Sequence, residues 1–410
     1  MRKIILCLLC CCSLIACSDA KKYAPKEGRI SVFEQETPSR AKGEIVLDKA
    51  IVLDDWQQPM HNMQNKVPNV SVSQLEDDVW REKLGKKSDL KNRSLPAPVV
   101  LGEAIYLLDG TYTLTCTKLE DGKRVWQNKL AENKAGISLG SNGEMLFALS
   151  TDGVLTAVDT EGNQVWQKDF GAEMRAPLLV DKKSLYLITA HNQFMALRAK
   201  DGKEIWRYQT TKPQTWLTEM ASPAKAKGVV VVPFATGEMI GFDADSGLLL
   251  WIQMMIGNRP QDLTEIPQIT AAPVIDGNTV YLTGNANLSG AYDLKTGETK
   301  WTTLFSSAVT PIVSNTALFM ITNQNALTAL DKRNGKIFWQ KEMVLDSNRH
   351  WRSLMLMNDE LVLSDGKTLT FVNPQTGEVL RTKKEAIASH PVSVKEHVLF
   401  VDENVKGTYY

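Results

Sequence analysis

Ala291-Tyr292-Asp293-Leu294-Lys295-Thr296-Gly297-Glu298-Thr299-Lys300-Trp301 is the clearest copy of a pattern that recurs along this chain of 410 residues. A glycine is followed four residues later by a tryptophan at six places: Gly122/Trp126, Gly162/Trp166, Gly202/Trp206, Gly247/Trp251, Gly297/Trp301 and Gly335/Trp339. The successive tryptophans are 40, 40, 45, 50 and 38 residues apart. Repeats of this length that hold short β-rich runs are typical of propeller blades.

Each repeat reads as four strands. Before Trp301, the β-rich residues 272–275 and 279–283 flank the turn Asp276-Gly277-Asn278, and residues 288–293 and 298–302 flank a second turn at Gly297. Glycine supplies the positive φ that a short hairpin connection needs. A seventh repeat, residues 353–381, keeps the turn glycine but has Arg381 where the tryptophan would be.

The eighth repeat is split between the two ends of the chain. Three β-rich runs, residues 391–394, 397–401 and 407–410, end the sequence, and residues 78–81 give a lone strand of the outermost type near the N-terminus. Pairing the two pieces would close the ring and leave no free radial edge. The sequence therefore predicts an all-β fold, an eight-bladed β-propeller of four-stranded antiparallel blades, closed by an N-terminal strand that pairs with the C-terminal blade. Seven blades is the alternative if the terminal pieces do not pair.

The aromatic and acidic residues of the repeat are predicted to be structural. A large ring at a fixed place on each outer strand packs most simply between neighbouring blades. Asp243, Asp293 and Asp331, four residues before the turn glycines, could indicate a metal or catalytic site, but hydrogen bonds that cap the turns explain them better. The predicted structural tryptophans are Trp80, Trp126, Trp166, Trp206, Trp251, Trp301 and Trp339.

The N-terminus reads as a bacterial lipoprotein signal. A basic start is followed by an apolar run, residues 4–14, that is too short to span a membrane, and by Leu14-Ile15-Ala16-Cys17. We expect residues 1–16 to be removed, Cys17 to be acylated, residues 17–75 to form a tether, and residues 76–410 to form the propeller. Ser18, in place of an aspartate, favours the outer membrane. Residues 56–62, which contain Trp56, either pack against the propeller or meet a partner.

The composition excludes several classes of function. The 47 basic and 47 acidic residues balance, so no basic face for nucleic acid is expected. Cys116 is the one cysteine left after Cys17 and the four in the signal, so no disulfide can form within the mature chain. The histidines are scattered, and no zinc, Walker or nucleophile-elbow motif occurs. We therefore predict no catalytic residue, no metal site and no cofactor.

The pattern Ala-x-Asp-x-x-x-Gly-x-x-x-Trp resembles the PQQ-type β-propeller repeat of quinoprotein dehydrogenases over roughly residues 78–410. With a lipoprotein signal in front and no enzyme domain behind, the chain resembles the BamB family of outer-membrane assembly lipoproteins, and residues 56–62 resemble alphaproteobacterial members. The resemblance implies a non-enzymatic scaffold in the Bam complex. Quinoprotein dehydrogenases carry a pair of adjacent cysteines over the quinone and calcium ligands, and Cys116 alone cannot supply that pair.

Two neighbouring connections between blades are enlarged. Trp166 to Pro177 is 11 residues and Trp301 to Pro311 is 10, whereas Trp206 to Pro223 is 17 and Trp251 to Pro273 is 22. Both leave the same kind of strand, so both should rise side by side on one face of the ring, where long loops commonly carry recognition. Apolar residues surrounded by charge suit a protein interface. The predicted partner-binding residues are Trp216, Leu217, Thr218, Arg259, Asp262, Leu263, Glu265 and Ile266.

The resemblance implies that these loops contact the periplasmic POTRA domains of BamA. Leu217 matches a leucine of the family's contact segment, Thr218 replaces its arginine, and Asp262 with Glu265 approximates its acidic pair. The expected protein is a monomer within a complex that also holds the other Bam lipoproteins, anchored by lipid to the outer membrane and facing the periplasm. The alternatives are a periplasmic module that binds cell-wall glycans or peptides, loops that fold over their own blades, and a quinoprotein dehydrogenase.

Overall fold

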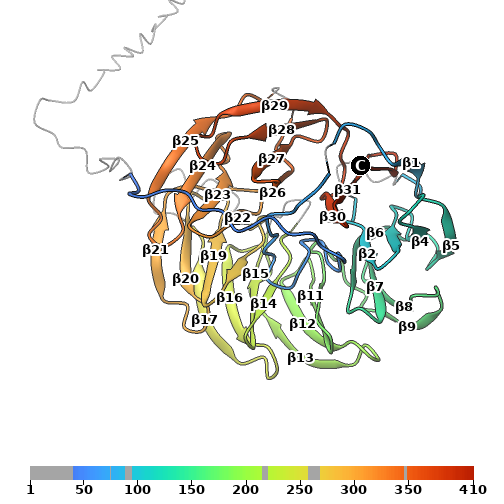
Figure 1. Cartoon of the computed structure of the whole chain (residues 1–410). Coiled ribbons are helices and arrows are strands. Elements are labelled where there is room, and N and C mark those ends of the chain that lie inside the picture. The colour runs from blue at the N-terminus through green and yellow to red at the C-terminus, as the bar shows by residue number, and fades with distance from the viewer. Residues whose placement is uncertain (1–39, 74, 88–94, 215–219, 257–267, 346–348) are drawn as a thin grey trace, which may run out of the picture. The chain divides into compact units, whose positions relative to one another are not determined.

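The prediction of an eight-bladed propeller is confirmed. The computed structural model describes residues 40–73, 75–87, 95–214, 220–256, 268–345 and 349–410. These residues form eight four-stranded antiparallel sheets arranged in a ring (Figure 1), and they contain strands and turns but no helix. Within these ranges there is accordingly no helix of the length and apolarity needed to cross a membrane.

The blades are numbered in chain order, and each is built outward from its first strand. The first four blades are β2 (Val99–Leu101), β3 (Ala104–Leu108), β4 (Thr113–Lys118), β5 (Arg124–Lys129); β6 (Gly136–Ser141), β7 (Met145–Ser150), β8 (Val154–Asp159), β9 (Gln164–Asp169); β10 (Leu179–Val180), β11 (Ser184–Ile188), β12 (Gln193–Arg198), β13 (Glu204–Gln209); and β14 (Ala224–Ala226), β15 (Val229–Pro233), β16 (Glu238–Asp243), β17 (Leu249–Met254).

The other four blades follow the same plan, except that the last one takes its outer strand from the N-terminal side of the chain. They are β18 (Val274–Asp276), β19 (Thr279–Thr283), β20 (Ser289–Asp293), β21 (Thr299–Thr303); β22 (Ile312–Val313), β23 (Ala317–Ile321), β24 (Ala326–Asp331), β25 (Ile337–Glu342); β26 (Ser353–Met357), β27 (Glu360–Ser364), β28 (Thr368–Val372), β29 (Val379–Lys384); and β30 (Val392–Val394), β31 (His397–Val401), β32 (Lys406–Tyr409) with β1 (Trp80–Lys83).

The pairing of β1 with β32 closes the ring, as the sequence predicts. The two strands run antiparallel, with Trp80 opposite Tyr409 and Lys83 opposite Lys406. The indole of Trp80 stacks on the Tyr409 ring at 5.4 Å between centroids, and its Nε1 donates to the Leu119 carbonyl of the first blade. Chain ends that are far apart in sequence therefore complete one sheet, and that sheet is fixed to the next blade.

Each recurring position of the repeat has a distinct structural role. The alanine of the pattern lies opposite the tryptophan of the next strand, as Ala291 does with Trp301, and a β-bulge follows it. The small side chain leaves room for the indole. The aspartate caps the turn: Asp293 Oδ1 accepts from the backbone N–H of Lys295 at 2.9 Å, and Asp243 and Asp331 do the same in their blades.

The glycine receives the tryptophan of the preceding blade. A Cβ on Gly335 would lie 2.5 Å from the ring of Trp301, and φ at Gly335 is 71°, so a side chain there meets both a clash and backbone strain. The indole N–H of each repeat tryptophan also donates to a carbonyl of the following blade. These bonds join Trp80 to Leu119, Trp126 to Thr160, Trp166 to Ala199, Trp206 to Ala244, Trp251 to Leu294, Trp301 to Lys332 and Trp339 to Pro374, at 2.8 to 3.2 Å.

The topology explains why the seventh blade has Arg381 in place of the repeat tryptophan. The eighth blade has no turn between its outer two strands, because β32 and β1 come from opposite ends of the chain. A tryptophan at 381 would have no turn glycine to pack against. Arg381 instead lies over the Phe371 ring of its own blade, at 3.9 Å from the centroid, and pairs with Glu360 at 2.7 Å.

Candidate functional site

The ring has two faces, which carry different segments of the chain. The connection from the previous blade leads into one end of a blade's first strand. The turn to the second strand leaves the other end. Connections and first turns therefore lie at opposite ends of the blades. We call these ends the connection face and the turn face. Of the described residues, the connection face carries 84–87, 95–98, 130–135, 170–178, 210–214, 220–223, 255–256, 268–273, 304–311, 343–345, 349–352 and 385–391. The turn face carries residues 102–103, 142–144, 181–183, 227–228, 277–278, 314–316, 358–359 and 395–396.

The two enlarged connections, residues 210–223 and 255–273, have stems that lie side by side on the connection face. The backbone N–H of Ala221 donates to the carbonyl of Ile269 at 3.3 Å, and the backbone N–H of Met220 donates to the carbonyl of Arg175 at 3.1 Å. Met220 and Ile269 are buried, with 4% and 1% of their surfaces exposed. The stems are thus packed into the third and fourth blades and joined to each other.

The second stem is also fixed to the fifth blade. Asn285 Nδ2 donates to the carbonyl of Gln268 at 2.6 Å, and Thr270 Oγ1 contacts Asn285 Oδ1 at 3.3 Å. At the other end of the connection, Ile256 forms a parallel bridge with Ala286. The predicted partner-binding residues in 215–219 and 257–267 lie outside the described residues, so their interface remains a prediction.

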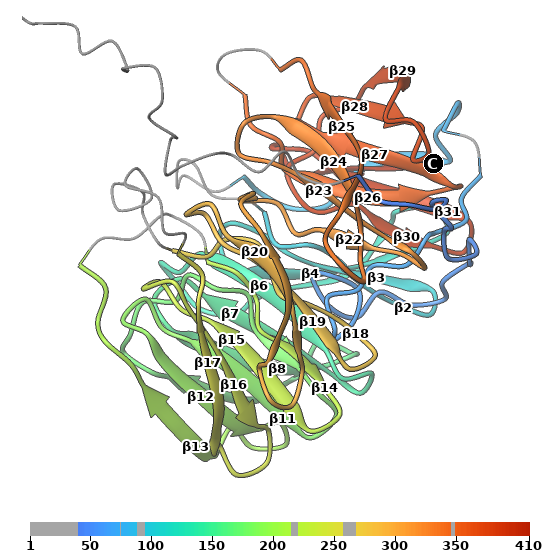
Figure 2. The same cartoon turned by 90° about the vertical axis from the view of Figure 1, so that its left-hand side faces the viewer.

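A segment that the sequence analysis assigned to the tether, residues 40–73, covers the turn face. We call it the strap; it is drawn in blue in Figure 1 and lies beside β2 and β31 in Figure 2. It makes a hydrogen bond to every blade. In strap order these join Asp48 N to Ser314 Oγ (2.7 Å), Leu53 O to Lys395 N (2.7 Å), Trp56 N to Val100 O (2.9 Å), Gln57 O to Ser141 N (2.8 Å), Gln58 Nε2 to Val180 O (2.7 Å), Met63 O to Lys225 N (2.7 Å), Gln64 O to Ile275 N (2.9 Å) and Val70 N to Leu356 O (3.0 Å).

Trp56 is the buried centre of the strap. Its side chain is 0% exposed, and it pairs through its backbone with Val100 of β2. Its ring stacks on His390, two residues before β30, at 6.0 Å between centroids, and lies 5.1 Å from the His61 ring. Because β2 and β30 are the innermost strands of adjacent blades, the indole lies at the inner wall of the ring. Of the two interpretations of residues 56–62, the structure shows packing against the propeller.

Burial controls the protonation of the two histidines beside Trp56. Burial lowers the pKa of His61 to about 4. Burial also lowers the pKa of His390, and the Pro391 carbonyl, 2.9 Å from its Nδ1, opposes that effect only in part. Both rings are therefore neutral at pH 7. An aromatic group of the chain itself, flanked by two neutral imidazoles, occupies this part of the inner wall.

The inner wall and Cys116 do not fit the quinone and calcium that the dehydrogenase alternative requires. Cys116 is buried opposite Trp126 in the outer half of the first blade, and burial raises the pKa of its thiol to about 11. In the described ranges no three His, Cys, Asp or Glu residues are grouped so that they could hold a metal ion. The ligand set that such a cofactor needs is thus not assembled by these residues.

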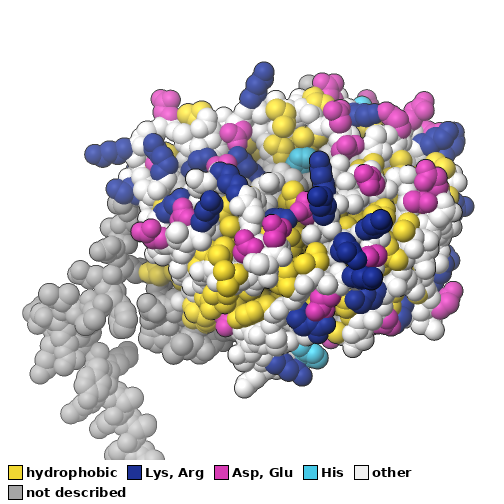
Figure 3. Space-filling view, turned by 90° about the horizontal axis from the view of Figure 1, so that it is seen from below, with side chains coloured by type: hydrophobic (Ala, Val, Ile, Leu, Met, Phe, Trp, Pro, Cys, Tyr) yellow, Lys and Arg dark blue, Asp and Glu magenta, His cyan; other side chains and the backbone are white. Residues whose placement is uncertain are grey.

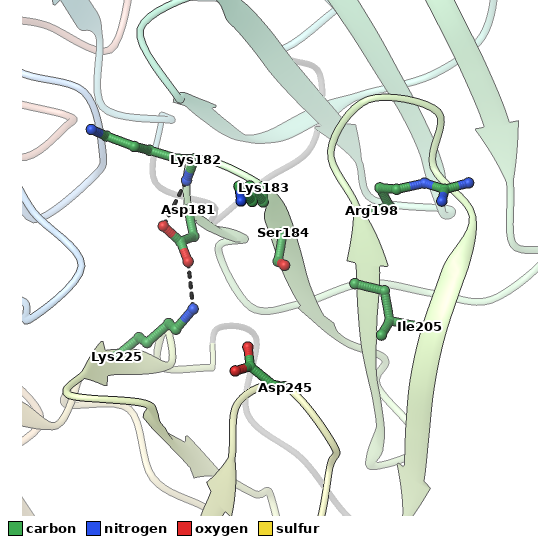
Figure 4. A pocket seen from close by; sticks show the side chains of 8 residues that line it. All are labelled: Asp181, Lys182, Lys183, Ser184, Arg198, Ile205, Lys225 and Asp245. Atoms are coloured by element: carbon green, nitrogen blue, oxygen red, sulfur yellow. Dashed lines mark hydrogen bonds and ion pairs between the residues drawn. The ribbon is translucent and has the colours of Figure 1, made fainter.

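A pocket of about 470 Å³ lies between the third and fourth blades near the turn face (Figure 4). Three of its six charged side chains form ion pairs: Asp181 pairs with Lys225, and Arg198 pairs with Asp201 at 2.8 Å. Its single hydroxyl nucleophile, Ser184, has no histidine or cysteine beside it in the lining. The lining therefore contains no serine–histidine or cysteine–histidine pair. Its lining residues are Asp181, Lys182, Lys183, Ser184, Arg198, Ile205, Lys225 and Asp245.

The comparison with protein families decides what this ring belongs to. The family model described as outer membrane protein assembly factor BamB matches residues 113–341, more than half of the chain. The chain belongs to the BamB family. A BamB from Nitrosomonas eutropha is 24% identical over 306 residues, which cover 74% of this chain and 73% of that protein.

Solved structures share the fold of this BamB-family chain. BamB from Moraxella catarrhalis superposes with a TM-score of 0.65 at 15% identity, covering 80% of this chain and 97% of that one. The quinohemoprotein alcohol dehydrogenase of Comamonas testosteroni reaches 0.67 at 12% identity, covering 85% and 76%. The propeller alone thus does not separate an assembly factor from a dehydrogenase. Of the two, the assembly factor is the one whose family model matches this chain.

Proposed function

We propose that this chain is a non-catalytic scaffold lipoprotein of the outer-membrane β-barrel assembly machinery. Acylated Cys17 anchors it to the outer membrane, and the propeller faces the periplasm. Connections 210–223 and 255–273 bind the POTRA domains of BamA, in a complex with the other Bam lipoproteins. Membership of the BamB family, whose members are described as outer membrane protein assembly factors, supports the role.

The joined stems are the observation that supports the choice of binding surface. The hydrogen bond between Ala221 and Ile269 holds the two connections together. Because the stems are already buried and fixed, they lose little conformational freedom on binding. Loops presented by a rigid framework are frequent carriers of recognition. The strap covers the turn face. The two enlarged connections lie on the opposite face, which the strap does not cover.

Charge reversal in the connections should release the partner. We expect the variant Trp216→Ala, Asp262→Lys, Glu265→Lys to reduce the BamA that co-purifies with the chain by at least about tenfold, because it removes an apolar anchor and inverts the neighbouring charge. A matched control, Glu144→Lys with Glu161→Lys, reverses two exposed acidic residues in turns of the opposite face. Equal recovery of BamA from both variants, with both folded by circular dichroism, would refute the assignment of the interface.

A further inference from the structure

The outer strand of the fourth blade, β17, differs from the other outer strands in its side chains. Every outer strand is a sheet edge with one strand neighbour, as β17 has β16. Half of the backbone N–H and C=O groups of such a strand point away from the sheet, and natural proteins commonly place charges there to prevent another strand from pairing. Among the eight outer strands, β17 is the one that carries no charged residue; its sequence is LLWIQM.

Instead, β17 exposes apolar side chains. On the side of the strand away from Trp251, Leu250, Ile252 and Met254 are 38%, 46% and 47% exposed. In the preceding turn and at the strand's start, Leu248 and Leu249 are 65% and 37% exposed. Figure 3 views the molecule from below Figure 1, on the side where β13 and β17 lie. Hydrophobic side chains are gathered on this side. We call these five residues the β17 strip.

The other blades provide an internal comparison for the β17 strip. The position after the repeat tryptophan is Ile252 in β17, where it lies opposite Ile240. In three other blades a glutamine there donates to a threonine on the adjacent strand: Gln127 to Thr115, Gln167 to Thr156 and Gln340 to Thr328, at 2.9 to 3.1 Å. The fourth blade has lost both members of this polar pair. At that position the outer strands of the other seven blades carry Arg81, Gln127, Gln167, Arg207, Thr302, Gln340 and Thr382.

A comparable difference occurs two residues further on. Met254 stands where five other outer strands end in a charged residue, Lys83 of β1, Lys129 of β5, Asp169 of β9, Glu342 of β25 and Lys384 of β29. Leu304, at the same position of the fifth repeat, is also apolar, but it lies beyond the end of β21. The residue of β21 that corresponds to Ile252 is the polar Thr302. The β17 strip is therefore the place where an unpaired backbone edge and a continuous row of apolar side chains coincide.

We propose that the β17 strip binds an extended polypeptide strand that is uncharged and has apolar residues at alternate positions. The strand would add antiparallel to β17, with backbone hydrogen bonds along the open edge and its apolar side chains on Leu250, Ile252 and Met254. The absence of charge on β17 favours a neutral strand, because a charged side chain placed against these residues would lose hydration without gaining a partner.

The segments of transmembrane β-barrels have this alternating pattern. Naming an unfolded barrel protein as the source of the strand rests on the proposed function. The binding chemistry does not, because it follows from the edge and from the side chains of β17. The strip shares no residue with 215–219 or 257–267, so different variants test the two proposals and each can fail without the other.

Peptide binding to the full-length chain tests the proposal. The probe is a labelled peptide of alternating valine and threonine, flanked by lysines for solubility, and its counterpart is N-methylated at alternate amides so that one edge cannot form hydrogen bonds. We expect Ile252→Gln with Met254→Lys, which copies Gln127 and Lys129 of β5, to weaken binding of the unmodified peptide by about tenfold or more. N-methylation should have a similar effect on binding to the unaltered chain.

Three controls make each outcome decisive. Thr382→Gln with Lys384→Glu changes the same positions of β29 and should bind the peptide as the unaltered chain does. Leu250→Lys, which copies Lys300 of β21, gives a second variant in case the first misfolds. The triple variant in the enlarged connections should keep peptide binding even where it releases BamA. Binding that survives both β17 variants, binding indifferent to N-methylation, or a dimer of this chain that the β17 variants dissolve would overturn the proposal.

Discussion

Replacing Trp56 with alanine should lower the free energy of unfolding by about 3–5 kcal/mol, the usual cost of truncating a buried aromatic side chain. The indole is 0% exposed and contacts His61 and His390. Its removal leaves a cavity at the inner wall of the ring, and that wall consists of short first strands that cannot close over the space without breaking their own pairing. The strap, which the indole holds at its centre, should then loosen.

Equilibrium denaturation by urea, followed by tryptophan fluorescence and circular dichroism, measures this effect. Val52→Ala is the matched control, since Val52 lies in the same strap but is 43% exposed; its effect should stay within about 0.5 kcal/mol. If Trp56→Ala were no more destabilising than Val52→Ala, the strap would not be an integral part of the fold.

The second large effect is a loss of stability on acidification. Burial lowers the pKa of His61 from 6.5 to about 4, so between these values the unfolded chain binds a proton that the folded chain does not. Stability therefore falls as the pH drops below about 6.5, and the loss is complete near pH 4. Between pH 7.5 and pH 5 we expect His61 to account for about 2 kcal/mol. The lowered pKa of His390 acts in the same direction.

His61→Asn is the variant that isolates this contribution. His61 has a positive φ of 69°, a conformation that asparagine adopts more readily than most residues, and asparagine does not titrate. The free energy of unfolding, measured by urea at pH 7.5 and pH 5, should fall less in His61→Asn than in the unaltered chain. An identical pH dependence in the two proteins would show that His61 is not held neutral by the fold.

The fold could be predicted from the sequence because its main contacts repeat. Gly297 packs against Trp251 of the preceding blade. Each glycine and tryptophan of the pattern therefore takes part in a contact between blades, and the pattern marks these contacts in the sequence. The split eighth blade was predictable for a related reason: three C-terminal strands lack an outer partner, and Trp80 marks a strand of that type. The enlarged connections were visible as an excess of residues between one tryptophan and the next proline.

The strap was harder to predict because it has no period. It bonds to the blades mainly through its backbone and through the amides of Gln58 and Asn65, and such contacts leave little pattern in a sequence. The surroundings of Trp56 likewise involve His390, which is more than 300 residues away in the chain. Leu248 to Met254 was equally ambiguous, since an apolar run fits a buried strand as well as an exposed edge.

Site-specific photo-crosslinking in living cells tests the central claim, that the ring presents its connection face to BamA while the strap covers the other face. One variant carries a photoreactive phenylalanine derivative at Leu263, in the connection 255–273, and a second carries it at Val46, an exposed residue of the strap. We expect a BamA crosslink from position 263 and none from position 46. A BamA crosslink from position 46, with none from position 263, would contradict the account.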